Sequence, residues 1–122
     1  MRLRQRIEQC QASKTARGLF WAAALFAFVM AVLPHPPHIP GNPSDKLQHI
    51  GAFVTLAVLG SFAYPAVALT ALLVRLSIFG AVIELIQAIP VLHRDCDFWD
   101  WVADIIAVTM GLLIVRWWRS RR

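Results

Sequence analysis

The chain has 122 residues, of which 58% are hydrophobic, and its mean hydropathy is +0.59. This apolar share exceeds that of soluble domains and predicts a single integral membrane domain. The net charge of +5 does not indicate nucleic-acid binding, because the bases lie at the ends of apolar runs.

The first apolar run extends from Gly18 to Leu33 and follows a basic segment, residues 1–17. It ends at Pro34, whose ring disfavours a continued helix. At about 1.5 Å per residue the run only just approaches the roughly 30 Å of hydrocarbon in a bilayer. A cleaved signal peptide is therefore an alternative. Because no persuasive cleavage site precedes Pro34, we predict a retained transmembrane helix over about 18–33.

A proline-rich connection follows, and its composition is typical of an extended segment. Ser44 is suited to cap the next helix, which we predict over about 45–64 before Pro65 interrupts it. A third apolar run predicts a helix over about 66–89, where Pro90 closes it.

The last apolar run predicts a helix over about 98–118, followed by a basic tail, residues 119–122. Two tryptophans lie near each end of this helix, as in the aromatic belts of one spanning segment. They are Trp99, Trp101, Trp117 and Trp118. Nine of the twelve bases lie before the first run or after the last apolar stretch, which predicts that both termini are cytoplasmic. The predicted fold class is an all-α membrane bundle of four transmembrane helices.

The polar residues gather at the opposite, outer face. Six of the seven acids lie between positions 45 and 104, although a charge at mid-membrane costs about 3 kcal/mol even on a lenient scale. Spacings of three or four residues place the members of each set on one helix face. The sets are Asp45 with His49, Glu84 with Gln87, and Asp97 with Asp100 and Asp104. If these faces meet, they line a pocket in the outer leaflet, where the available cations are Lys46, Arg94 and a protonated His49.

The cysteines and the remaining histidines give weaker signals. The predicted topology places Cys10 and Cys96 on opposite sides of the membrane, so no disulfide between them is expected. His35 and His38, with His93 and Cys96, offer a poor metal-binding pattern, because their spacings match no strong zinc motif. We predict no metal and no cofactor.

Three short motifs occupy the polar face. They are Ser44 to His49 with Phe53, then Glu84, Leu85 and Gln87, and then Arg94, Asp97 and Asp100, with Ala103 and Gly111 also in place. Together they resemble the motifs of the VanZ-like membrane proteins, a family named for a protein of glycopeptide-antibiotic resistance clusters. The resemblance covers about residues 45–111. The sequence departs from the family at Asp104, where the family usually has Asn, and at Ala107, where it usually has Gly.

The resemblance implies a small polytopic membrane protein, in some members associated with lowered susceptibility to teicoplanin, and no established reaction. Our first hypothesis is that the outer pocket binds the polar part of a phospholipid or a lipid-linked cell-envelope precursor. Lys46 and Arg94 would hold anionic oxygens, and carboxylates would meet hydroxyl or amine groups. The predicted ligand-binding residues are Lys46, Gln87, Arg94, Asp97, Asp100 and Asp104.

Two alternatives belong to other functional classes. One is a membrane enzyme that acts on lipid-linked phosphate or sugar esters, with His49 as base or nucleophile, oriented by Asp45 or Glu84. The other is a structural or partner-binding module, in which residues such as Glu84 and Gln87 only connect helices.

Overall fold

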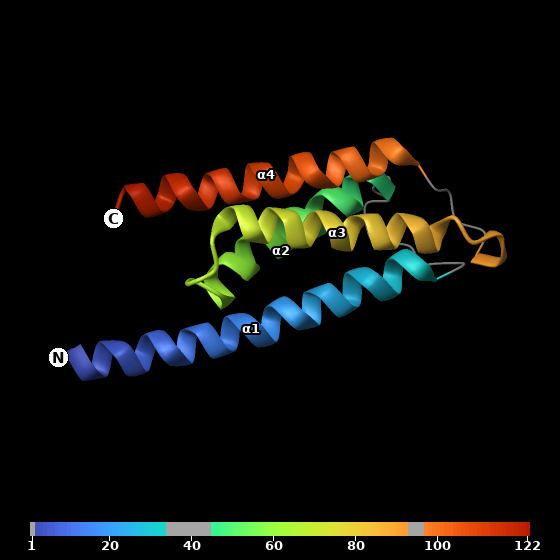
Figure 1. Cartoon of the computed structure of the whole chain (residues 1–122). Helices are drawn as coiled ribbons and strands as arrows, with labels where there is room; N and C mark the ends of the chain where they lie inside the picture. Colours follow the sequence, from blue (N-terminus) through green and yellow to red (C-terminus); the bar gives the residue numbers. More distant parts are fainter. Residues whose placement is uncertain (1, 34–44, 93–96) are drawn as a thin grey trace.

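The structure is a computed structural model that describes residues 2–33, 45–92 and 97–122. These residues form four α-helices and one short 3-10 helix, with no strand among them (Figure 1). They are α1 (Arg2–Val32), α2 (Asp45–Ala63), α3 (Leu69–Gln87), η1 (Pro90–Leu92) and α4 (Phe98–Ser120). All four α-helices are long and apolar enough to cross a membrane. The predicted all-α architecture with four membrane-length helices is confirmed.

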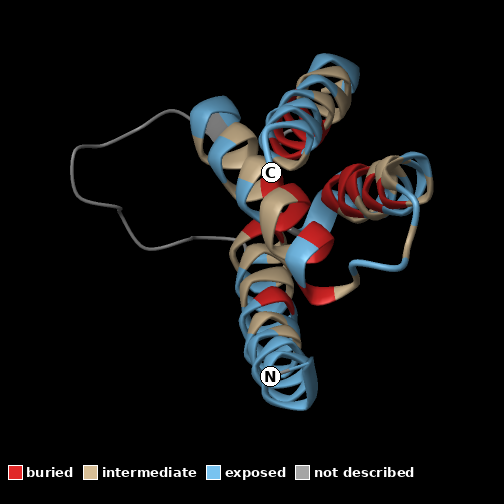
Figure 2. Cartoon of the chain, turned by 90° about the vertical axis from the view of Figure 1, so that its left-hand side faces the viewer, coloured by how far each residue is buried: buried red, intermediate tan, exposed pale blue. Residues whose placement is uncertain are grey.

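Helix α1 begins earlier than predicted, because it includes the basic segment, residues 2–17, that precedes the apolar run. With 31 residues at about 1.5 Å each, it is longer than the hydrocarbon layer is thick. Its N-terminal end extends past the ends of α2 and α3 (Figure 1), and residues 2–12 are exposed (Figure 2). An ion pair between Arg4 Nε and Glu8 Oε1, 3.0 Å apart, spans one turn of this end.

Local interactions set the boundaries of α3 and α4. After Pro65 the chain makes a turn, closed where the Val67 N–H donates to the Tyr64 carbonyl at 3.0 Å, so α3 begins only at Leu69. Helix α4 begins after Asp97, whose side chain accepts the backbone N–H of Trp99 at 3.0 Å. Such a cap satisfies one of the unpaired N–H groups of the first helical turn.

Helix α2 lies among the other three helices and contacts each of them (Figure 2). Its buried residues Phe53, Leu56 and Ala57 pack in the core with Ile83 of α3 and Val108 of α4. The outward sides of the helices also carry large apolar residues. Examples are Leu25, Ile78, Ile106 and Ile114. Apolar side chains on both the inner and outer sides are what a bundle surrounded by lipid requires.

Small residues bring α2 and α4 close together. A Cβ atom added at Gly111 would lie 3.0 Å from Cβ of Ala57 and 3.4 Å from the Val54 carbonyl oxygen. Helix pairs in membranes use such small residues because close backbone approach gives them van der Waals contact without a hydrophobic driving force. Gly111 and Ala57 therefore fix the approach of α2 to α4.

Both termini lie at the same end of the bundle, which we call the basic end (Figure 1). There the carbonyl groups that close α2 accept hydrogen bonds from neighbouring helices. Ser13 Oγ and Arg17 Nε of α1 donate to the Ala63 carbonyl at 2.9 and 3.1 Å, and Arg119 of α4 donates to the Ser61 carbonyl at 2.9 Å. Cationic donors at a helix C-terminus also interact favourably with its dipole. The basic end is thus held together through the last turn of α2.

Candidate functional site

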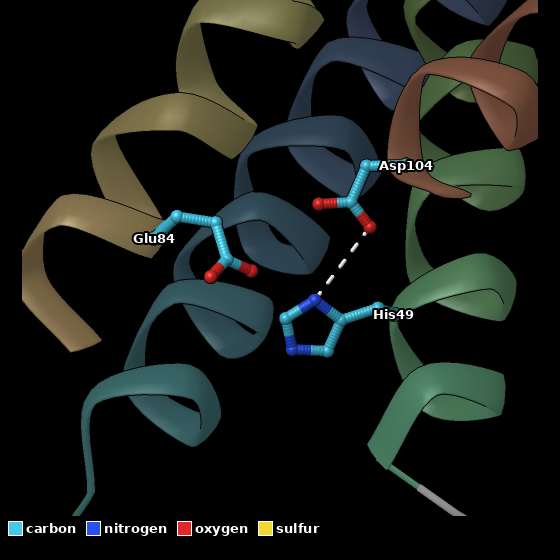
Figure 3. Close-up of side chains that lie close together, drawn as sticks. All are labelled: His49, Glu84 and Asp104. Carbon is cyan, nitrogen blue, oxygen red and sulfur yellow. Dashed lines mark ion pairs between the residues drawn. The ribbon is translucent and has the colours of Figure 1, made fainter. Parts of the chain in front are cut away.

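Three polar side chains from three helices converge at the opposite end of the bundle. They are His49 of α2, Glu84 of α3 and Asp104 of α4, which we call the triad (Figure 3). Nδ1 of His49 lies 3.6 Å from Oδ1 of Asp104, and one nitrogen or oxygen atom of each side chain lies within 4.8 Å of the others. Asp104 is fully buried and Glu84 is 6% exposed. We call this end, with the triad, Lys46 and Asp100, the acidic end.

Hydrogen bonds within the described residues satisfy the triad only in part. Oε2 of Glu84 accepts the backbone N–H of Asp97 at 3.2 Å, which ties the end of α3 to the start of α4. The buried atoms Oε1 of Glu84, Nδ1 of His49 and both carboxylate oxygens of Asp104 have no hydrogen-bond partner there. Buried polar atoms are nearly always paired, because leaving one unpaired costs about 1–3 kcal/mol. The triad is therefore suited to hold a further partner.

A glycine makes room for the buried carboxylate of Asp104. A Cβ atom at Gly80, one turn before Glu84, would lie 3.2 Å from Oδ2 of Asp104 and 3.4 Å from Cζ of Phe53. The neighbouring Trp101 is held in place because its indole N–H donates to the Ser77 carbonyl at 2.9 Å. Gly80 therefore leaves room for one member of the triad, and Trp101 packs beside this glycine.

A second charged pair lies beside the triad. Nζ of Lys46 is 3.7 Å from Oδ1 of Asp100, and half of the lysine side chain is exposed. Asp100 precedes Asp104 by four residues, so the two acids share one face of α4. The acidic end thus combines a buried histidine–carboxylate set with an accessible ion pair.

A cavity of about 370 Å³ opens between α1 and α2 beside this polar set. Its wall is largely apolar, with Phe26 and Met30 on α1 and Phe53 on α2, and Ile83 of α3 also lines it. His49 lines the same cavity, so a ligand in an apolar groove can reach the edge of the triad. This mixture of an apolar wall and few polar groups is typical of ligand sites.

No family model matches the chain, and no curated protein or solved structure matches it. The VanZ-like resemblance stays a prediction from the three sequence motifs.

The structure brings together most of the described residues that the sequence singled out. His49, Glu84 and Asp104 form the triad, Lys46 pairs with Asp100, and Asp97 contributes its backbone N–H and the cap of α4. Gln87 is not a member of the triad, and its side-chain amide donates to the Ala31 carbonyl of α1 at 2.9 Å. That contact agrees with the alternative in which Gln87 connects helices.

Several predicted residues lie outside the described part of the structure. They are Arg94, the side chain of Asp45, and the weak metal set of His35, His38, His93 and Cys96. Two features of the site were missed by the sequence analysis. Residue spacing associates His49 with Asp45 or Glu84 rather than with Asp104, and it gives no signal for Gly80. Helical spacing identifies residues on one face, whereas the pairing of faces depends on how the helices are rotated.

Among the described residues, the triad is the set whose donor atoms lie close enough to hold a metal ion. One imidazole and two carboxylates can also exchange protons or accept hydrogen bonds from hydroxyl and amine groups. The chemistry available at the acidic end is therefore cation binding, proton transfer and recognition of polar headgroups.

Proposed function

We propose that the chain is a VanZ-like multi-pass protein of the cell membrane that binds the headgroup of a lipid or a lipid-linked envelope precursor at its acidic end. The observation that carries the proposal is the cavity of about 370 Å³ between α1 and α2, which is apolar along most of its wall and reaches His49. An acyl chain fits the apolar wall, and the attached headgroup then meets the polar residues.

The charged groups beside the cavity suit an anionic headgroup that also carries hydroxyl or amine groups. Lys46 is accessible, and in this proposal it leaves Asp100 to bind anionic oxygens of the headgroup. The carboxylates accept hydrogen bonds from the hydroxyl or amine groups of the headgroup. Arg94, which precedes Asp97 and Asp100 in the sequence, serves as the second cation in this proposal.

We further propose that the basic end faces the cytoplasm, because nine of the twelve bases lie beyond the apolar runs at the two chain ends. The acidic end then opens to the outer leaflet, where lipid-linked envelope precursors are used. Occupation of the site by such a precursor is the route by which the protein would affect glycopeptide susceptibility.

The test uses a phosphatidylglycerol with a photoreactive diazirine in its acyl chain, added to the purified full chain in nanodiscs. Crosslinks mapped by mass spectrometry should concentrate on the stretches of α1 and α2 that line the cavity. Ala27→Trp adds an indole to the cavity wall and should lower this labelling by about tenfold, equivalent to about 1.4 kcal/mol. Lys46→Gln should lower the preference for phosphatidylglycerol over phosphatidylcholine.

The control is Ile78→Trp, which places the same indole on an exposed position of α3. Labelling of the cavity should be unchanged in this variant. Crosslinks spread evenly over the outer faces of all four helices, with no effect of Ala27→Trp, would show that only the surrounding lipid is sampled and would refute the proposal.

One observation favours a second candidate, a membrane enzyme that acts on lipid-linked phosphate or sugar esters. An imidazole beside a buried carboxylate, as in the pair of His49 and Asp104, is an arrangement that supports a general base. Turnover of such esters by the wild-type chain, compared with His49→Ala, tests it. Equal rates in both proteins remove His49 from any mechanism.

A further inference from the structure

The triad has the composition and the spacing of a metal site. It offers one imidazole nitrogen and two carboxylate groups from three different helices, with donor atoms that all lie within 4.8 Å of one another. In a site with bonds of about 2.1 Å, neighbouring donor atoms lie about 3.0–3.5 Å apart. The 3.6 Å between Nδ1 of His49 and Oδ1 of Asp104 is close to that value, and side-chain rotations would bring the third donor, now within 4.8 Å, into the same range.

The burial of Asp104 points independently to a bound cation. Its carboxylate is fully buried, and neither oxygen has a hydrogen-bond partner within the described residues. Glu84 adds a second buried carboxylate, with Oε1 likewise without a partner there. His49, even when protonated, balances only one of these two carboxylates, and uncompensated negative charge is strongly unfavourable in the apolar interior. Lys46 pairs with Asp100, outside the triad, and a divalent cation would neutralise both carboxylates.

The surroundings of the triad hold its donor atoms in place. The backbone N–H of Asp97 binds Oε2 of Glu84 at 3.2 Å and leaves Oε1 for a ligand. Gly80 leaves space for Oδ2 of Asp104. Figure 3 shows the three side chains turned toward a common centre from α2, α3 and α4. Outer groups of this kind orient metal ligands and strengthen metal binding.

We propose that His49, Glu84 and Asp104 bind one divalent transition-metal ion at the acidic end. A single imidazole with carboxylate oxygens suits Zn²⁺, Mn²⁺, Fe²⁺ or Co²⁺, whereas Cu⁺ prefers sulfur ligands and Ca²⁺ prefers oxygen ligands alone. The cavity that His49 lines provides a route to the triad. This site does not depend on lipid binding, so the loss of lipid labelling and the loss of metal are separate outcomes.

The test uses Co²⁺ as the probe with the untagged full chain in detergent, after metal removal with a chelator. We expect one Co²⁺ per chain by elemental analysis, visible absorption from the bound ion, and loss of that absorption when Zn²⁺ is added. Asp104→Asn and Glu84→Gln should each lower Co²⁺ affinity by at least about tenfold, since each removes a charged ligand. Glu8→Gln, which changes an exposed acid on α1, should have no effect.

Circular dichroism and gel filtration establish that each variant is folded. The proposal would be overturned if folded Asp104→Asn and Glu84→Gln bound Co²⁺ with the same affinity as the wild-type chain. It would also be overturned if the wild-type chain bound no stoichiometric Co²⁺. X-ray absorption spectroscopy of the Zn²⁺-loaded wild-type chain identifies the metal ligands without relying on the variants. One imidazole with oxygen ligands is expected, and sulfur ligands or several imidazoles would overturn the assignment.

Discussion

Nδ1 of His49 lies 3.6 Å from Oδ1 of Asp104, and this pair links α2 to α4 where the aspartate is fully buried. In such a position each group depends on the other, because removing one partner leaves a buried polar or charged group without compensation. The pair of Lys46 and Asp100 at the same end differs, since half of the lysine side chain is exposed. The two pairs therefore contribute differently to stability.

Replacing one member of the buried pair should destabilise the metal-free protein strongly. We expect His49→Leu and Asp104→Leu each to lower the free energy of unfolding by about 3–5 kcal/mol. The double variant should recover part of this loss, with a coupling energy of at least about 1 kcal/mol. Reversible unfolding in mixed detergent micelles measures these values. For Lys46 and Asp100 we expect a coupling below about 1 kcal/mol, and a larger coupling there than in the buried pair would contradict this view.

A methyl group at Gly111 should disturb the contact between α2 and α4. The added Cβ would lie 3.0 Å from Cβ of Ala57, so we expect Gly111→Ala to lower the free energy of unfolding by about 1–3 kcal/mol. At Gly18 nothing lies within 4 Å of an added Cβ, and Gly18→Ala should be neutral or stabilising by up to about 1 kcal/mol. Unfolding curves should therefore show a lower free energy of unfolding for Gly111→Ala and no loss for Gly18→Ala.

The hydrogen bond from Arg119 to the Ser61 carbonyl, 2.9 Å long, should stabilise the basic end. Arg119→Met keeps most of the side-chain length and removes the donor, and we expect a loss of about 1.5 kcal/mol, as for other hydrogen bonds to charged groups. Arg116→Met, at an exposed position of the same helix, is the matched control and should change stability by less than about 0.5 kcal/mol. Equal losses in both variants would show that general charge, and not this hydrogen bond, is responsible.

The two cysteines test the proposed orientation directly. Cys10 lies in the exposed N-terminal part of α1, and we expect it to react with an impermeant maleimide only after the cells are opened. Cys96 should react in intact cells. Cys96→Ser and Cys10→Ser isolate the two signals, and gel mobility after labelling with a polymer-linked maleimide reads them out. Labelling of Cys10 in intact cells would show that the chain has the opposite orientation to the one proposed.

Most of the architecture follows from apolar runs and prolines. Pro65 separates α2 from α3, and the four apolar runs coincide with α-helices that could span a membrane. The first apolar run predicts a helix that begins at residue 18, whereas α1 begins at Arg2. Hydropathy reports only the part that enters lipid, while the preceding arginine, glutamine and alanine residues favour helix without being apolar.

The site could be predicted as a set of residues but not as a set of contacts. Glu84 and Asp104 stood out because acids inside apolar helices are rare and usually functional. Their relation to His49 depends on how α3 and α4 are rotated against α2. Close packing at Gly111 and Ala57 constrains the approach of α2 to α4. The spacing of Gln87 from Glu84 is compatible both with ligand binding and with a contact between helices. Only the structure shows that its side chain donates to α1.

Helix α1 forms one wall of the cavity but contributes no side chain to the triad. The fold thus separates two tasks between different stretches of the chain. If the cavity binds lipid as proposed, exchanges at Phe26, Ala27 or Met30 would change which hydrocarbon tails fit, while His49, Glu84 and Asp104 keep the same polar chemistry. Under that proposal, the preference for a tail and the contacts with a headgroup could change independently of each other.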